Sequence, residues 1–207
     1  MEAGGGRNPG VDRPIMIYLD GGKVGALDNW IGSVKTFEDA RDFVMRIGVC
    51  CVLQNKKGEP NLYDAIDAPE KQPGEKGWGE KVSKTWGWKN ALPASYPDEI
   101  FYGKRKDGKA ILCSMECLKA MYADQHRPVE ELSETAQQLY NLIRQSPANN
   151  KELRELAYLT GKSNNYRFDR ALLDLQIAFN IVRINRTDLD GDTWTLFTVQ
   201  YPDFSPS

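Results

Sequence analysis

Apolar positions along this chain recur with two periods, one typical of amphipathic helices and one typical of strands. In the first half, a helical period begins at Thr36, where Thr-Phe-Glu-Asp has the form of a capping box, and it stops at Gly48. The apolar run 49–53 then predicts a short buried strand, and 61–66 predicts another short helix. The segment 78–90 also has helix-compatible spacing, although its two glycines weaken that prediction.

A β-hairpin is the clearest strand signal. Two apolar runs within 99–113 flank Asp107-Gly108, a pair that tight primed turns favour. Ser114 follows at the position of an N-cap, which predicts another helix. The chain then becomes polar around Pro128, and we interpret this change as a domain boundary.

The last third contains three successive helical patterns. Ser133 is placed to cap the first helix, Asn149 or Asn150 the second, and Ser163 the third. Two apolar β runs follow, the second at 194–199, and a polar turn joins them. Helix, helix, short glycine-containing turn, helix and hairpin is the order of a winged helix-turn-helix domain.

These patterns predict an α+β fold in three parts. Residues 1–32 include a Gly-rich stretch without periodicity and are expected to form a largely flexible N-terminal tail. Residues 33–127 are expected to form a small mixed α/β region that contains the hairpin 99–113. Residues 131–202 are expected to form the winged-helix domain.

Composition narrows the class of protein. The 207 residues are 41% hydrophobic and 27% charged, as in ordinary globular proteins. The longest apolar runs are far shorter than the ~20 residues of a membrane span, so we expect no membrane partner. Four cysteines in a chain of this length form no disulfide framework, and reduced thiols indicate a cytoplasmic location. The net charge of −2 argues against a protein that coats nucleic acid without specificity.

The beginning of the third helix is the first candidate DNA contact. In helix-turn-helix proteins this part enters the major groove, where cations and amides contact phosphates and base edges. The candidate residues are Lys162, Ser163, Asn164, Asn165, Arg167 and Arg170. An alternative is that the polar residues only cap the helix and that the arginines form a solvated face.

The wing gives a mixed signal. Arg183 and Arg186 could approach phosphates, and Arg186 is a candidate contact. The acids Asp188, Asp190 and Asp192 would repel those phosphates. Residues 133–207 hold eight Lys/Arg against nine Asp/Glu, so this third is not basic.

The middle of the chain is the second candidate surface. Residues 71–109 hold nine Lys/Arg against five Asp/Glu, and aromatic residues, Trp78 among them, are interleaved with the cations. Such a mixture suits a surface that follows phosphates and stacks on unpaired bases. The candidates are Trp86, Trp88, Lys89, Lys104 and Arg105. Alternatively, the tryptophans fill a small core and the lysines solubilise its rim.

Metal, cofactor and hydrolase chemistry have no support in the sequence. Cys113 and Cys117 form no CxxC pair, and His126 is the single histidine and has no evident nucleophilic partner. The segment 188–192 resembles a calcium loop but lacks the closing Glu. We therefore expect no metal and no cofactor.

Four segments together resemble a known family. They are 35–48, 84–93 with Lys-Thr-Trp-Gly-Trp-Lys-Asn-Ala-Leu-Pro, Tyr102-Gly-Lys104, and 159–176 with Leu-Thr-Gly-Lys-Ser-Asn-Asn-Tyr-Arg. The pattern resembles the short AlkZ-related proteins, relatives of the AlkZ/YcaQ winged-helix DNA glycosylases that excise alkylated bases and unhook interstrand crosslinks. The resemblance covers about residues 33–201 and implies contact with double-stranded DNA, including distorted or damaged DNA.

The catalytic pair of the glycosylases does not carry over. Those enzymes have Gln-x-Gln or Gln-x-Asp in an N-terminal stretch that follows a glycine. With Gly48 as that glycine, Cys51 and Leu53 occupy the paired positions, and Gln54 is out of register. We therefore assign no catalytic residue.

Three hypotheses on function follow. The first is a winged-helix DNA-binding protein linked to DNA repair, without a recognisable catalytic pair. The second is a base-excision enzyme with a non-standard site, for which Asp64, Asp67 and Glu80 are unassigned candidates. The third is a protein-interaction module, which would be favoured if Lys162, Arg167 and Arg170 were buried or paired with Asp169 and Asp174.

Overall fold

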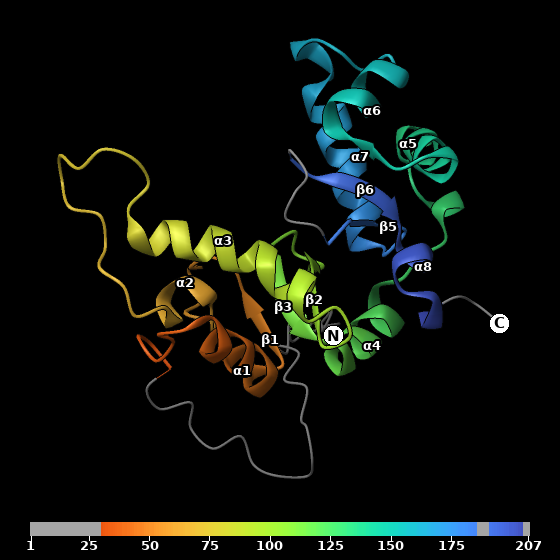
Figure 1. Cartoon of the computed structure of the whole chain (residues 1–207). Coiled ribbons are helices and arrows are strands. Elements are labelled where there is room, and N and C mark those ends of the chain that lie inside the picture. Colours follow the sequence, from red (N-terminus) through yellow and green to blue (C-terminus); the bar gives the residue numbers. More distant parts are fainter. Residues whose placement is uncertain (1–29, 186–190, 205–207) are drawn as a thin grey trace, which may run out of the picture.

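The computed structural model describes residues 30–185 and 191–204. The fold is α+β, with helices arranged around two three-stranded antiparallel sheets (Figure 1). Among these residues, no helix is both long and apolar enough to cross a membrane.

The first half of the fold has one sheet and four helices. Its elements are α1 (Phe37–Ile47), β1 (Val49–Cys51), α2 (Leu62–Ala65), α3 (Glu80–Ser95), β2 (Ile100–Lys104), β3 (Ala110–Ser114) and α4 (Met115–Gln125). The strand order is β1-β3-β2, with β3 paired antiparallel to both neighbours. The hairpin is therefore confirmed, and its second strand is the centre of the sheet.

Local signals explain where these elements begin and end. The predicted capping box of α1 is present, because the Thr36 Oγ1 accepts the Asp39 N–H at 3.1 Å and the Asp39 Oδ2 accepts the Thr36 N–H at 2.9 Å. Gly48 ends α1 with a φ of 79°, and a Cβ there would lie 2.8 Å from the Cys117 Sγ. The Ser114 side chain caps α4 as predicted, by accepting the Cys117 N–H at 3.3 Å.

The first sheet is buried on both faces. Along β1 and β3, Cys50 and Leu112 belong to the cluster with α1 and α3, whereas Cys51 and Ile111 belong to a second cluster. The adjacent Cys50 and Cys51 thus lie in different cores, as the period of two in a strand requires. Because both faces are covered, the run is apolar throughout rather than alternating.

The second half repeats the predicted order of elements. Its described elements are α5 (Glu134–Gln145), β4 (Ala148–Asn149), α6 (Asn150–Leu156), a 3-10 turn (Lys162–Asn164), α7 (Asn165–Ile177), β5 (Ile181–Arg183), β6 (Thr193–Leu196) and α8 (Phe197–Gln200). Strand β6 pairs antiparallel with both β4 and β5. Short 3-10 turns at Val129–Glu131 and Pro202–Phe204 flank this half. The helices α5 and α7 pack through a core that contains Leu139, Phe168 and Leu175.

Two predictions for this half are wrong. Ser163 does not cap the third helix, because it lies inside the 3-10 turn and α7 begins at Asn165 without a side-chain cap. The strand expected over 194–199 ends at Leu196, because the chain then turns into α8 and buries Phe197 completely.

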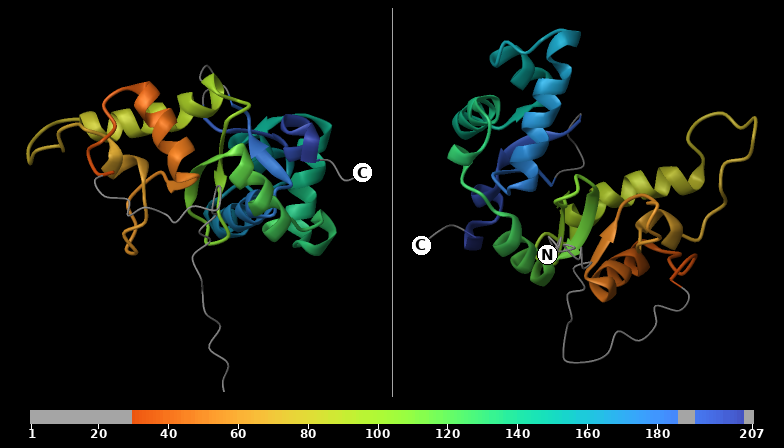
Figure 2. Two further views of the ribbon diagram at one scale, coloured as in Figure 1. Left: turned by 90° about the horizontal axis from the view of Figure 1, so that it is seen from below. Right: turned by 180° about the vertical axis from the view of Figure 1, so that it is seen from behind.

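An aromatic cluster joins the two halves. Phe101 of β2 lies 5.9 Å from Phe179 and 6.2 Å from Phe197, measured between ring centroids. Tyr122 of α4 stacks on Phe197 at 5.4 Å, so α4 and α8 lie side by side, as both views in Figure 2 show. The core therefore continues across the polar segment around Pro128.

Candidate nucleic-acid interface

The 3-10 turn at Lys162–Asn164 and the beginning of α7 present a polar surface to solvent. Lys162, Ser163, Asn165, Arg167 and Arg170 are all exposed. Asn164 is half-buried, and its Nδ2 donates to the Thr160 carbonyl at 2.9 Å. The opposite face of the helix is buried and consists of Phe168, Ala171, Leu172 and Leu175. The sequence thus separates a core face from a face that is available for binding.

The cations near this surface differ in their partners. Arg170 pairs with Asp174 at 3.1 Å, one helical turn away. The Arg167 Nε donates to the Thr135 Oγ1 of α5 at 2.6 Å. Within the described part of the chain, no acid lies within ion-pair distance of Lys162 or Arg167. These two cations are therefore the ones whose charge is not neutralised locally.

Arg154 links the neighbouring helices α6 and α7. Its Nη2 lies 2.7 Å from the Asp169 Oδ1, and its Nη1 donates to the Asn165 Oδ1 at 3.2 Å. The guanidinium also lies 3.9 Å from the centroid of the buried Phe168 ring. Arg154 therefore fixes the angle between α6 and α7, a role that the spacing of the sequence did not reveal.

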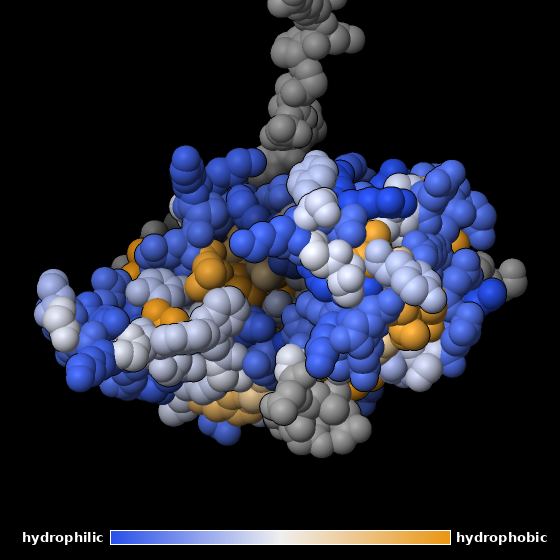
Figure 3. Space-filling view, turned by 90° about the horizontal axis from the view of Figure 1, so that it is seen from above, coloured by the Kyte–Doolittle hydropathy of each residue, from blue (hydrophilic) through white to orange (hydrophobic). Residues whose placement is uncertain are grey.

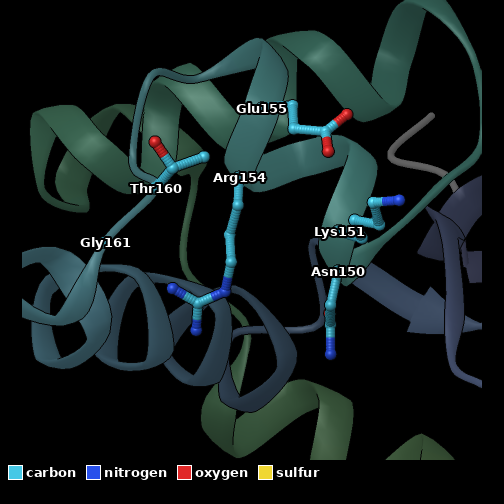
Figure 4. A pocket seen from close by; sticks show the side chains of 6 residues that line it. All are labelled: Asn150, Lys151, Arg154, Glu155, Thr160 and Gly161. Atoms are coloured by element: carbon cyan, nitrogen blue, oxygen red, sulfur yellow. The ribbon is translucent and has the colours of Figure 1, made fainter.

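An open hollow of about 350 Å³ lies beside this linkage, between α6 and the turn that follows it (Figure 4). In Figure 4, Arg154 extends from α6 across to the ribbon of α7, while Thr160 and Gly161 line the side of the turn. Lys151 and Glu155 supply one charge of each sign to its lining.

Arg183, the last residue of β5, faces inward. Arg183 is only 7% exposed, and its Nη1 donates to the Asn90 Oδ1 of α3 at 2.5 Å. It also lies 3.4 Å from Asp192 and 4.4 Å from the centroid of the Tyr102 ring. Arg183 therefore joins the two halves and is not placed to approach phosphates. Arg186 and the acids at 188 and 190 lie outside the described residues.

The candidates of the middle region are mostly packed into the fold. Trp86 and Trp88 are half-buried and pack against the first core. Lys89 is 8% exposed, and its ammonium lies 4.8 Å from both the Trp86 and Tyr102 ring centroids. Burial, together with the nearby charge of Arg183, lowers the pKa of Lys89 to about 8.

The two candidate cations of the hairpin, Lys104 and Arg105, also have defined surroundings. Burial lowers the pKa of Lys104. Arg105 lies 2.8 Å from Glu59 and 2.7 Å from Asp107, and its hydrogen bonds to Asp107 hold the pKa of that carboxyl well below its usual range. The charge of Arg105 is thus balanced by two acids inside the protein.

Trp78 has a different environment from the other tryptophans. It is 64% exposed, directly before α3, at the end of the loop that Figure 1 shows extending away from the body.

Figure 3 shows a hollow between the two halves, with hydrophobic residues inside it and hydrophilic residues around its rim.

The positions of the glycosylase pair show no Gln-x-Gln or Gln-x-Asp motif, but an amide and a carboxylate do meet. Cys51 is buried, and Leu53 is 45% exposed. The Gln54 Nε2 donates to the Asp64 Oδ1, and the Asn61 Nδ2 donates to the Asp64 Oδ2 at 2.9 Å. This contact joins residues ten apart and has no signal in the linear motif.

The other unassigned acids have no comparable surroundings. Asp67 is exposed, and Glu80 pairs with Lys84 at 2.7 Å. Over the described ranges, no three His, Cys, Asp or Glu side chains come together as metal ligands. Burial raises the pKa of the Cys50 and Cys113 thiols, which disfavours the thiolate form.

Comparison with known proteins gives one match. A family described as AlkZ related matches residues 34–198. A search of curated proteins and a search of solved structures each found no match. The matched range covers both halves of the fold, including α3, the hairpin and α7.

Proposed function

Because the chain belongs to the AlkZ-related family, we propose that it is a winged-helix DNA-binding protein linked to DNA repair. Its second half would bind duplex DNA through α7, with the hairpin of β5 and β6 as the wing. The order α5, β4, α6, α7, β5, β6 supports this assignment, since a winged helix has three helices followed by a hairpin that pairs with the short first strand.

The observation that carries the proposal is the exposed beginning of α7. Asn165 and Arg167 lie in the first turn of α7, the part that enters the major groove in helix-turn-helix complexes, and Lys162 lies in the 3-10 turn directly before it. Lys162 and Arg167 have no acid within ion-pair distance in the part of the chain that the structure describes. Cations without such partners gain most from phosphate, because no internal ion pair has to be broken.

The test is the affinity for a fluorescent 20-base-pair duplex, measured by anisotropy over a range of salt. We expect the logarithm of affinity to fall linearly with the logarithm of salt, by about 0.9 for each phosphate contacted. Lys162→Ala should weaken binding and reduce that slope by about one. The control is Lys119→Ala, which removes an exposed cation from α4 in the first half. Binding that is absent, or independent of salt, refutes the proposal.

Arg167 tests the same surface with one added condition. Because the Arg167 Nε donates to the Thr135 Oγ1, an alanine there also removes a contact between α7 and α5. Arg167→Lys keeps the charge and loses the planar donor group. Weakened binding in both variants, at unchanged melting temperature, would indicate contact with DNA rather than loss of structure.

Base excision is a second candidate, favoured by the contact between Gln54 and Asp64. An enzyme that removes a base needs a pocket and a positioned polar pair. Gln54 and Asp64 supply an amide next to a carboxylate, with Gln54 exposed at the surface. Wild type should then release base from an alkylated duplex, and Asp64→Asn should not, while both bind intact duplex equally. The absence of release by wild type on alkylated duplexes would exclude this candidate.

The protein-interaction module has weaker support. Of the three cations that would be paired in such a module, Arg170 meets an acid, Asp174, but Lys162 and Arg167 remain exposed. A charged surface of this kind matches DNA better than an apolar partner.

A further inference from the structure

A row of aromatic rings and cations, here called the ladder, runs from the exposed loop to the junction of the two halves. Its members are, in order, Trp78, Trp86, Lys89, Tyr102 and Arg183. The Trp78 and Trp86 rings meet edge to face at 6.3 Å. The Lys89 ammonium lies 4.8 Å from the Trp86 ring centroid and 4.8 Å from that of Tyr102. Arg183 covers the Tyr102 ring at 4.4 Å and contacts Asn90 of α3. The five side chains come from the loop, α3, β2 and β5.

Exposure changes from one end of the ladder to the other. Lys89 is 8% exposed and Arg183 is 7% exposed, whereas Trp78 is 64% exposed. The inner members are held by neighbours on both sides, so they form a fixed support for the outer one. Trp78 thus contacts Trp86 and keeps most of its surface in water, where the ring is accessible to a ligand.

The loop that carries Trp78 is held in place by its own contacts. The Lys71 Nζ donates to the Gly77 carbonyl at 2.5 Å, and the Gln72 N–H donates to the Glu75 carboxylate at 2.9 Å. Gly79 has a φ of 81°, and a Cβ there would lie 2.8 Å from the Lys71 Cβ. Because the loop is already ordered, little conformational entropy is lost when a ligand contacts the ring.

The charge around Trp78 favours an anionic ligand. Without the buried Lys89, residues 69–88 hold four lysines against three glutamates. Two of the glutamates are engaged by lysines, in Lys81–Glu70 at 3.8 Å and Lys84–Glu80 at 2.7 Å. Lys76 is exposed, and no acid within the described ranges lies in ion-pair distance of it.

We propose that Trp78 is the stacking platform for an unpaired base of DNA, with the lysines of its loop facing the adjoining phosphates. An exposed ring beside surplus positive charge is the combination that binds single-stranded nucleic acid, because every base offers a face for stacking and every linkage a phosphate. This inference rests on the proposed DNA-binding function, and it adds the structural class of DNA: a duplex with unpaired nucleotides. The site therefore lies on Trp78 rather than on Trp86 or Trp88, whose rings are packed into the fold.

The experiment compares the full chain on three labelled DNAs of equal length: a paired duplex, the same duplex with three unpaired thymidines, and a thymidine single strand. Wild type should prefer the interrupted duplex over the paired one. Trp78→Ala should reduce that preference by roughly five- to a hundredfold, the range of one stacked base. Trp78→Phe keeps a ring and should retain part of the preference, and Lys119→Ala should retain all of it.

The outcomes separate this inference from the proposed function. Affinity for the paired duplex tests the function of α7, and Trp78→Ala should leave it unchanged. If wild type binds the paired duplex but shows no preference, or if Trp78→Ala keeps the preference, the stacking platform is refuted and the function stands. If wild type binds only the single strand, and does so through Trp78, the α7 proposal fails and the platform stands. Equal melting temperatures of the variants exclude misfolding. If the loop binds a protein instead of DNA, Trp78→Ala should not change the affinity for any of the three DNAs, and the stacking platform is refuted.

Discussion

Two residues with the same unusual backbone conformation should respond in opposite directions to the same substitution. Tyr158 has a φ of 56° and Phe179 a φ of 53°, in the left-handed region that glycine adopts without strain. Tyr158 follows α6 and is 87% exposed, whereas Phe179 is 2% exposed within the aromatic cluster. The backbone cost is similar at both sites, so burial decides the sign.

The magnitudes follow from these exposures. At Tyr158, glycine removes about 1–2 kcal/mol of left-handed strain and loses roughly 0.4–1 kcal/mol through a more flexible unfolded chain. Since the ring buries little surface, Tyr158→Gly should stabilise the protein by about 0.5–1 kcal/mol. At Phe179, the same relief is exceeded by the roughly 3–5 kcal/mol lost when a buried phenylalanine is truncated. Phe179→Gly should therefore destabilise by about 2–4 kcal/mol.

Urea denaturation followed by tryptophan fluorescence measures both changes in the free energy of unfolding, and thermal denaturation gives the melting temperatures. Tyr158→Gly should raise the melting temperature by about 1–4 °C for a chain of this size, and Phe179→Gly should lower it by several degrees. A clear destabilisation by Tyr158→Gly would refute the reasoning, because it would require contacts of that ring which an 87% exposed side chain does not make. A weakened affinity for duplex DNA together with raised stability would place Tyr158 in the interface with DNA.

Substitutions at three further positions test other features. Lys89 has a folded pKa of about 8 and an unfolded pKa near 10.4, so the cost of its buried charge is present below pH 8 and disappears towards pH 10. Between pH 7 and pH 10, the free energy of unfolding of wild type should therefore rise relative to that of Lys89→Met, as measured by denaturation at each pH. A difference that stays constant would contradict the burial of this charge. Gly48→Ala should destabilise by at least 1 kcal/mol in the same assay, because its Cβ would clash with Cys117 and its φ is positive; an unchanged midpoint would show that α1 ends differently. Asn149→Ala removes the capping box of α6 and should cost about 1 kcal/mol, whereas Asn149→Ser should restore most of it.

Local signals in the sequence predicted most element boundaries. The capping side chains of Thr36, Ser114 and Ser133 lie where the sequence places them, and the turn at Asp107-Gly108 joins two paired strands. Each of these signals depends on residues within four positions of one another, so a single sequence is enough to read them.

The departures come from contacts between distant residues. The predicted strand over 194–199 has the alternation of a strand. The chain nevertheless turns into α8 at Phe197, because this ring stabilises the fold more by packing in the cluster around Phe101 than it would by extending β6. Helix α3 continues to Ser95, through Gly87 and Pro93, because its buried Leu92 and Pro93 pack on the first core.

The candidate site was predictable only as a list of residue types. Spacing separated the exposed beginning of α7 from its core face, since both depend on the period of one helix. Spacing did not distinguish the packed Trp86 from the exposed Trp78. The two tryptophans lie eight positions apart in a segment of similar composition, and nothing in that segment indicates which ring packs on the core. Nor did spacing reveal Arg183 against Asn90, a contact between residues 93 positions apart.

The aromatic cluster shared by the two halves has a thermodynamic consequence. Separating the halves would expose Phe101, Phe179 and Phe197 together, at roughly 1.5–3 kcal/mol for each ring. The halves are therefore coupled, and they should unfold in one transition. If DNA binds α7 as proposed, the free energy of binding stabilises the whole molecule, and amide hydrogens in β1, which lies in the other half of the fold, should exchange more slowly in the complex.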